Sequence, residues 1–489
     1  MTSGIRWRLP EDAPAAYPFV KRFIDAWFCD PEVRTDFPTD PRGVLDRLGL
    51  DLDPTEMGRL VSPNEIDRLT NPEAIDERAL GDDLVSAWRR YAIRRYRAVR
   101  IERDARTPRR PGLAVWRARQ IARLRFELRP SSADQIRHIP FAFELTAGCS
   151  GRCWFCGVSA RPLEGVFERT PEHVALFRGL LDHLVDLYGP ESASDGILYW
   201  ATDPIDHPEY EAFVDDFVDR VGTAPATVTA LAGRRPERAA AILRALARHP
   251  ARTHRFSLLS RRDYRTIVER FDPESLACVE LLPQYRADLG LKFDVGRARE
   301  RRRATGGEIP AGGSGTIACL SGFIIDLVAR TIRVATPCNA SDERPDGVHE
   351  SGLFHFKDLP EARRIVDRLA EGLEVDVTSS AATFHRTPGV TFLDVEDTGV
   401  TRIGSAHHAV RTRLPIRGEA LDRGLAANGT VESLAATLAA EAGATPLEAI
   451  EILRILIDCG ALRARLAEER LPETVPLGIP ETKPEPPEG

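Results

Sequence analysis

The chain has 489 residues, of which 43% are hydrophobic and 29% are charged, and its formal net charge is −7. This is the composition of an ordinary globular protein, and so small a net charge gives no general attraction to nucleic acid or to a membrane surface. The first residues lack the pattern of a secretion signal, and no apolar run is long enough to span a bilayer. We therefore expect a cytoplasmic protein whose eight cysteines stay reduced, so that clustered thiols indicate metal binding rather than disulfides.

The first 80 residues are predicted to form a small helical domain, because Asp-Pro and Ser-Pro turns divide short helical patterns. A basic helical linker is expected over residues 81–138, with fifteen arginines between Arg89 and Arg129. Such a run either binds an acidic partner, such as a carboxylate-rich leader peptide, or is a solvated helix face.

Between residues 140 and 285, strand-like apolar runs alternate with amphipathic helices. One helix is expected to begin at Pro171 with Thr170 as its N-cap, and another to include Tyr210 and Val221. The alternation predicts an α/β core over residues 139–345, built as six strand–helix units of a partial eight-stranded barrel. The strands are expected at residues 141–146, 197–201, 227–231, 254–259, 276–282 and 317–327, with a hairpin partner at 331–335.

Residues 289–314 are basic and then glycine-rich, and this pattern predicts a mobile loop. Residues 346–400 are expected to extend the core or to connect it to a separate winged-helix-like domain over residues 401–466. The helices of that domain are predicted at 417–427, 430–441 and 446–458, the last with a capping box from Thr445 to Glu448. The tail at 467–489 is rich in proline and glutamate and is predicted to be disordered.

Cys149, Cys153 and Cys156 follow the first core strand in a C-x₃-C-x₂-C pattern. Three thiolates so close in sequence can hold an iron–sulfur cluster, which normally has four such ligands, so one iron stays open to another molecule. A zinc site would call for paired C-x₂-C motifs or a nearby histidine. Zinc binding and three incidental cysteines are the alternative interpretations.

With an aromatic residue, Phe155, before its third cysteine, this motif resembles that of the radical S-adenosylmethionine superfamily, and the resemblance covers about residues 140–340. It implies a TIM-like partial barrel that binds a [4Fe–4S] cluster and S-adenosylmethionine, with Phe155 near the adenine. Ala201, Thr202 and Asp203 take the place of the usual Gly-Gly-Glu turn, which binds the amino group of the cofactor. Asp203 is equally plausible as a turn residue. Ser257 resembles the polar residue that contacts the ribose or the carboxylate, although a strand serine is more often simply packed.

Four segments, in the same order along the chain, resemble the radical S-adenosylmethionine peptide epimerases of the proteusin type. The resemblance implies an isomerase that converts L-residues to D-residues in a ribosomally made precursor peptide, which it recognises through the leader. It also implies a reductant such as flavodoxin or ferredoxin. The alternative is a related enzyme that forms crosslinks or thioethers. The four segments are residues 153–160, 199–206, 316–323 and 337–342.

Inversion at Cα requires that a hydrogen atom arrives on the opposite face, and a cysteine thiol is the natural donor. Cys338 is favoured because it follows the last strand in a polar turn, at the expected mouth of the barrel, and Cys319 is the alternative. The C-terminal domain resembles leader-binding modules, although its apolar stripes also serve simply as the core of a helical domain.

Overall fold

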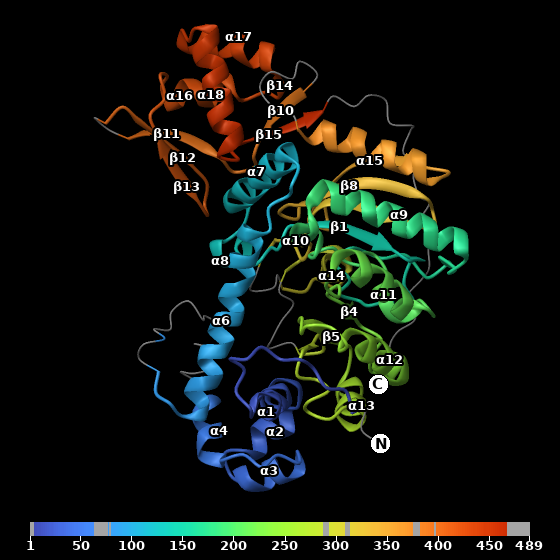
Figure 1. The fold of residues 1–489 in the computed structure, drawn as a ribbon. Helices are drawn as coiled ribbons and strands as arrows, with labels where there is room; N and C mark the ends of the chain where they lie inside the picture. Colours follow the sequence, from blue (N-terminus) through green and yellow to red (C-terminus); the bar gives the residue numbers. More distant parts are fainter. Residues whose placement is uncertain are drawn as a thin grey trace.

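The computed structural model describes residues 4–62, 77, 80–286, 293–308, 313–374, 382–395 and 398–466. They form a mixed α/β protein in which a helical N-terminal region and a C-terminal module lie on opposite sides of a central α/β core (Figure 1). Within these ranges no helix has the length and the apolar character needed to cross a membrane. The predicted disorder of 467–489 concerns residues outside the described ranges.

The N-terminal helices form as the Asp-Pro turns predict. Asp30, Asp40 and Asp53 each accept a backbone N–H of the following helix, whose first residue is proline. The helices bury apolar side chains such as Phe23 and Leu45 against the α/β core, and the two regions share one hydrophobic cluster. These helices are α1 (Tyr17–Cys29), α2 (Pro31–Asp36), α3 (Pro41–Arg47) and α4 (Pro54–Leu60).

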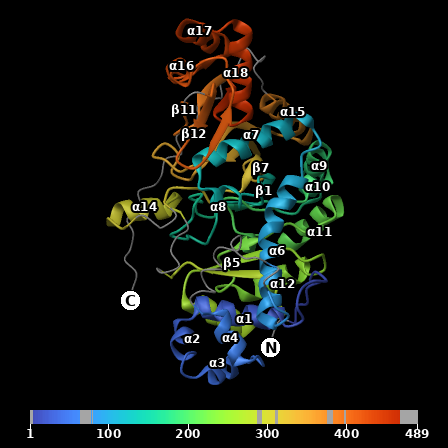
Figure 2. The same ribbon diagram turned by 90° about the vertical axis from the view of Figure 1, so that its left-hand side faces the viewer.

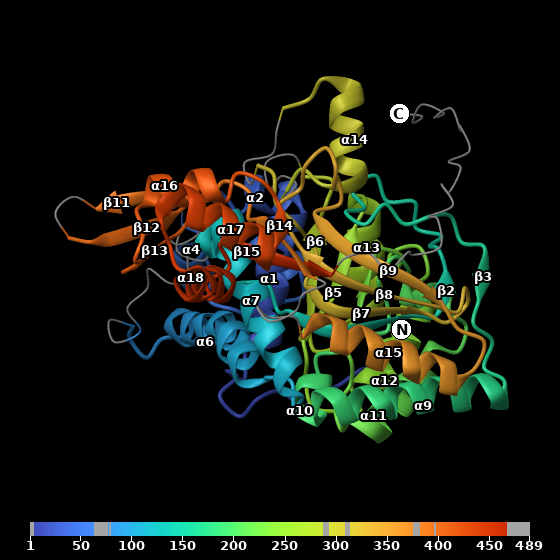
Figure 3. The same cartoon turned by 90° about the horizontal axis from the view of Figure 1, so that it is seen from above.

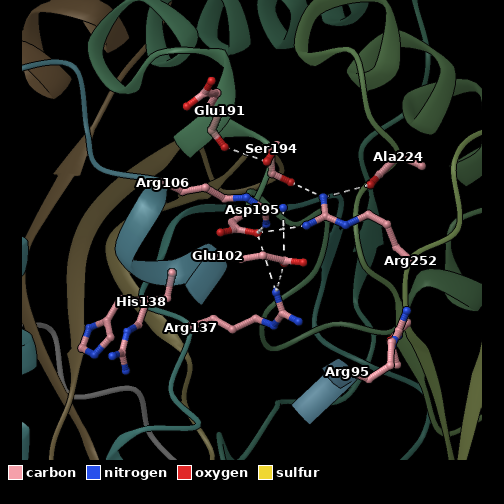
Figure 4. A network of polar contacts seen from close by, with 12 residues as sticks. Arg95, Glu102, Arg106, Arg137, His138, Glu191, Ser194, Asp195, Ala224 and Arg252 are labelled. Atoms are coloured by element: carbon pink, nitrogen blue, oxygen red, sulfur yellow. Dashed lines mark hydrogen bonds and ion pairs between the residues drawn. The ribbon is translucent and has the colours of Figure 1, made fainter. Parts of the chain in front are cut away.

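The arginine-rich segment forms α6 (Leu84–Ala105), α7 (Pro111–Glu127) and the short α8 (Pro130–Ala133). The expectation of a wholly solvated or partner-binding face is wrong for several of its arginines, since Arg103, Arg117 and Arg123 are buried. Arg106 is bound at 2.5 Å by Asp195, which lies in the core (Figure 4). A buried guanidinium requires hydrogen-bond partners, and for these arginines they include groups from distant parts of the chain, such as the carbonyls of Asp134 and Pro337.

The core strands lie in separate small sheets. β1 (Ile139–Glu144) pairs in parallel with β7 (Leu320–Asp326), which continues into antiparallel β8 (Thr331–Pro337) and β9 (Val348–His355). A second sheet has β4 (Val228–Thr229), β5 (His254–Leu258) and β6 (Val279–Pro283) in parallel. Ile197 joins β1 through one parallel bridge to Ala142. The described residues form no closed barrel. The predicted α/β class is confirmed, whereas the predicted partial barrel is not, because the strands lie in several small sheets.

Helices cover one face of these strands. Phe141 and Phe143 of β1 point to that side and pack against aromatic residues of α9 (Pro171–Tyr188) and α11 (Tyr210–Val221). The alternate residues therefore point to the opposite side, which we call the inner face. Further helices of the core are α10 (Pro190–Ala193), α12 (Pro236–Leu246), α13 (Arg261–Arg270) and α15 (Leu359–Leu373). The inner face is lined by Ala142, Glu144, Arg255, Ser257, Leu320, Ile324, Arg333 and Ala335.

Three sequence expectations for the core are corrected. The strand expected at 197–201 is reduced to its bridge at Ile197, and residues 276–278 form a turn before β6. The loop expected at 289–314 contains α14 (Gly296–Thr305), while 287–292 and 309–312 lie outside the described residues. Arginine and alanine are good helix formers, and Gly306 ends the helix in the left-handed conformation.

The C-terminal module has its own hydrophobic cluster, to which Phe126 of α7 also contributes. The three predicted helices are present as α16 (Gly418–Gly424), α17 (Val431–Ala442) and α18 (Pro446–Asp458), and the Thr445–Glu448 capping box is formed. The module begins earlier than residue 401, because β10 (Ala382–Arg386) pairs with β14 (Gly429–Thr430) and β15 (Leu462–Leu466). A second sheet contains β11 (Thr391–Val395), β12 (Val400–Gly404) and β13 (Ala409–Thr412).

Candidate metal centre

The three motif cysteines lie in a coiled loop after β1, at the carboxyl end of the core strands. A small hairpin of β2 (Thr146–Ala147) and β3 (Gly165–Val166) holds the base of the loop. The N–H of Cys149 donates to the carbonyl of Arg161 at 2.8 Å. Gly148 has φ +81°, and a Cβ there would lie 2.1 Å from the carbonyl oxygen of Pro162. Only glycine therefore allows the two ends of the cysteine loop to approach so closely.

Backbone N–H groups point at two of the three sulfurs. Gly151 donates to Sγ of Cys149 at 3.2 Å, and Ala160 donates to Sγ of Cys156 at 3.3 Å. The sulfurs of Cys149 and Cys153 both lie within 3.3 Å of the point that a Cβ of Gly151 would occupy. Hydrogen bonds to the ligating sulfurs are one of the means by which proteins tune iron–sulfur clusters.

The surroundings of the thiols do not favour a free thiolate. Burial raises the pKa of the Cys149 thiol to about 12, and the carboxylates of Asp203 and Asp206 act in the same direction. Burial also raises the pKa of the Cys153 thiol, to about 11. Ionised sulfur at this place therefore needs a cation to compensate it, and a coordinating metal deprotonates a thiol outright.

A single metal ion and an iron–sulfur cluster place different demands on the three thiols. In the described part of the chain, no three Cys, His, Asp or Glu side chains gather closely enough to share one metal ion. One zinc ion would draw its sulfurs to about 2.3 Å from a common centre. In a four-iron cube each thiolate binds its own iron, so the sulfurs need not converge on one point. The other cysteines of the chain are distant in sequence, and none follows the motif closely.

A buried carboxylate fixes the cysteine loop between its first two cysteines. Asp206 ends the short 3₁₀ helix η3 (Pro204–Asp206), and its side chain is fully buried. It accepts the N–H of Ser150 at 2.7 Å and the hydroxyl of Ser150 at 2.5 Å, and Arg235 lies at 3.2 Å. This role of Asp206 has no local sequence signal, because the contact depends on two segments that meet only in the fold.

Asp203 is placed as a structural anchor of the turn that precedes η3. Its two oxygens accept the Thr229 hydroxyl at 2.7 and 3.0 Å, and the N–H groups of Ala230 and Ile205 at 2.9 and 3.0 Å. Burial nevertheless raises its pKa to about 6. Asp203 thus ties the turn before η3 to the end of β4.

The other residues expected to bind the cofactor fall into two places. Phe155 lies in the cysteine loop, half-buried and edge-on to Trp154 with ring centroids 5.6 Å apart. Ser257 lies on the inner face of β5. Glu144, at the end of β1, has a role that no sequence motif signals. It accepts the N–H of Ala201 at 3.0 Å and pairs with Arg333 at 3.3 Å, which ties the turn at residue 201 to β1.

The two candidate hydrogen donors occupy different surroundings. Cys319 packs against the inner-face cluster together with Tyr199 and Trp200. Cys338 is only 2% exposed, and the charged groups that act on its thiol include Glu127 of α7. The next residue, Asn339, donates its N–H to Glu127 at 2.9 Å. Cys319 therefore borders the inner face, while Cys338 lies beneath α7.

Comparison with known proteins finds a similar chain in a bacterium. The protein is 32% identical over 354 residues to an uncharacterized protein, y4wI, of Sinorhizobium fredii (strain NBRC 101917 / NGR234). The alignment covers 70% of this chain and 68% of y4wI. No family model matches the chain, and no solved structure matches it. The similarity thus extends over most of both proteins rather than over one short motif.

Proposed function

The chain belongs to the same family as the uncharacterized protein y4wI, and we propose that it is a radical S-adenosylmethionine enzyme that converts L-residues of a ribosomally made precursor peptide to D-residues. The observation that carries this proposal is the cysteine loop. Its three thiols follow the first core strand, and two of them accept backbone N–H groups. Three protein thiolates leave one iron of a four-iron cluster free for another ligand.

The proposal gives the chain's own residues distinct tasks. Cys149, Cys153 and Cys156 would hold the [4Fe–4S] cluster, and the backbone of Ala201 and Thr202 would face the bound S-adenosylmethionine. When bound, this pair of cofactors would supply the 5′-deoxyadenosyl radical that removes a hydrogen atom from Cα. The inner face would receive the peptide, whose leader would be captured elsewhere, with the C-terminal module as the candidate.

We propose Cys319 as the hydrogen donor, and Cys338 as the alternative. The donor must reach the peptide on the side opposite the adenosyl group, so its thiol has to border the space in which the peptide lies. Cys319 packs with Tyr199 and Trp200 on the inner face, whereas Cys338 is covered. A donor role for Cys338 would require the contacts between Glu127 and the 338–339 segment to open.

The test combines isotope exchange with cysteine variants. The anaerobically reconstituted protein would be incubated with precursor peptide, S-adenosylmethionine and a reductant in heavy water. We expect one deuterium at Cα of each inverted residue and no other change in mass. The Cys319→Ala variant should still cleave S-adenosylmethionine but should no longer invert the peptide. Cys459→Ala, in the C-terminal module, serves as the matched control and should behave as the wild type.

Each other result has a defined meaning. Normal inversion by Cys319→Ala together with loss in Cys338→Ala would transfer the donor role to Cys338. A product lighter by two hydrogens would indicate crosslinking or thioether formation instead of inversion. Protein that binds no iron–sulfur cluster under anaerobic conditions would contradict the proposal as a whole.

A further inference from the structure

Helix α14 is a concentration of positive charge in a chain with a net charge of −7. It carries five arginines and one glutamate in ten residues. Figures 2 and 3, which view the molecule from two perpendicular directions, both show α14 projecting from the core. A helix that is basic and projecting can form a contact surface for an acidic partner.

The base of α14 is built onto the cysteine loop. The N–H of Arg297 donates to the carbonyl of Cys156 at 3.0 Å, and its guanidinium donates to the carbonyl of Ala160. Gly296 has φ +51°, and a Cβ there would lie 2.3 Å from the carbonyl oxygen of Cys156. The helix can therefore begin against the third motif cysteine only because glycine occupies this position.

The exposed arginines of α14 continue this surface outward. The Arg301 guanidinium stacks on the ring of Trp154, between the second and third motif cysteines, at 5.0 Å from the ring centroid. Among the described residues, Arg301 contacts no carboxylate. Arg303 is 48% exposed and pairs with Asp342, whose pKa is lowered by the arginines beside it. The outer end of α14 thus keeps a positive charge that its own surroundings only partly compensate.

We propose that α14 is the docking surface for the acidic one-electron carrier protein, of the flavodoxin or ferredoxin class, that reduces the cluster. This inference rests on the proposed function, since it requires a cluster in the cysteine loop. One electron leaves the reduced carrier, which is thereby oxidised by one electron, and the cluster is reduced by one electron. No covalent bond forms or breaks.

Position favours an electron carrier over an acidic leader peptide at this surface. Electron transfer requires that the carrier come close to the cluster, and the contacts of Arg297 and Arg301 are with the cysteine loop itself. A leader must instead deliver the core peptide to the inner face, where Cys319 lies. Opposite charges would also accelerate the encounter, and salt would suppress that acceleration.

The experiment compares a charge-reversed variant with a matched control. Arg301→Glu/Arg303→Glu changes the charge of α14 by four units, and Arg42→Glu/Arg47→Glu makes the same change on exposed residues of the N-terminal helices. Binding of an acidic flavodoxin to each reconstituted protein would be measured at low and at high salt. Cluster reduction would be followed by stopped flow with flavodoxin hydroquinone and, separately, with reduced methyl viologen, a small cation.

At low salt we expect the α14 variant to bind flavodoxin at least tenfold more weakly and to be reduced by it at least tenfold more slowly. Its salt dependence should flatten, and reduction by methyl viologen should not slow. The control should match the wild type in every assay. The single variants Arg301→Gln and Arg303→Gln should show smaller effects in the same direction, and they remain informative if the double variant folds poorly.

Wild-type binding and reduction by the α14 variants would overturn the inference and leave the proposed function intact. Unchanged flavodoxin binding with tenfold weaker precursor binding would also overturn it, by assigning the surface to the leader. If no preparation of the wild type takes up a cluster, the proposed function fails instead, which is a distinguishable result.

Discussion

Asp206 offers the sharpest test of how the chain prepares the cysteine loop. The Asp206→Asn variant keeps the shape of the side chain but removes its charge and replaces one of its acceptor oxygens with an amide nitrogen. The carboxylate holds both the N–H and the hydroxyl of Ser150, at 2.7 and 2.5 Å. A buried hydrogen bond to a charged group contributes about 1.5–3 kcal/mol. Arg235 is half-exposed, so its ion pair adds little.

One of the two Ser150 bonds survives in the variant, so we expect a loss of about 2 kcal/mol in the stability of the ordered loop. If cluster binding must restore that order, the apparent affinity for the cluster falls about thirtyfold, since 1.4 kcal/mol corresponds to a factor of ten. Iron and sulfide content and the EPR amplitude after limited anaerobic reconstitution would measure this. Urea unfolding would measure the stability.

The matched control is Asp216→Asn. Asp216 lies on α11, is equally buried, and is held by Arg169 at 2.8 Å and by Arg178 at 2.9 Å, away from the cysteines. We expect this variant to lose stability but to incorporate the cluster as the wild type does. Equal cluster content in Asp206→Asn and Asp216→Asn would refute the argument that Asp206 organises the loop.

Three further predictions concern the frame around the site. Burial lowers the pKa of His254 to about 3, so folding excludes a proton that the unfolded chain binds below about pH 6.5. The contribution of His254 to the free energy of unfolding should therefore be fully present above pH 6.5 and should fall by about 1.4 kcal/mol per pH unit between pH 6.5 and 3. Urea titrations should show a pH slope that is smaller by this amount in His254→Phe than in the wild type. Gly460→Ala would place a Cβ 2.3 Å from the backbone N of Arg123. Gly443 has a similar positive φ but open space around it, so Gly443→Ala should lower the free energy of unfolding by roughly 1 kcal/mol and Gly460→Ala by well over that. Denaturant midpoints of the two variants would measure the difference. Arg123→Met should cost about 3–5 kcal/mol because it leaves Glu127 buried and unpaired, and Arg123→Met/Glu127→Leu should recover most of the loss in the same assay.

The features that could be predicted from the sequence are those with a local cause. The helices after Asp30 and Thr170 begin where a capping side chain precedes a proline, and this signal lies within a few residues. The cysteine motif is local as well, since its three thiols lie within eight residues. No distant contact was needed to place either feature.

The features that escaped prediction depend on distant partners. The segment after Ile197 looks like a strand, but its pairing is limited to one bridge, and the N–H of Ala201 is bound by the side chain of Glu144 instead of by a neighbouring strand. The buried arginines of α7 looked like surface residues because several of the groups that they bind are distant in sequence. Arg123 illustrates this, since it donates to the carbonyl of Pro337 at 2.5 Å.

The segment from Asp195 to Asp206 pairs with β1 through a single bridge, and contacts at its two ends explain how it is nevertheless held in place. At the amino end of the core strands, Asp195 binds Arg106 at 2.5 Å and Arg252 at 2.9 Å, and Arg252 also donates to the carbonyl of Ser194 (Figure 4). At the other end, Asp206 holds the cysteine loop. Two buried carboxylates thus fix the segment on both sides of its single bridge. Charge-assisted bonds at its ends replace the ladder of backbone bonds that a longer strand would supply.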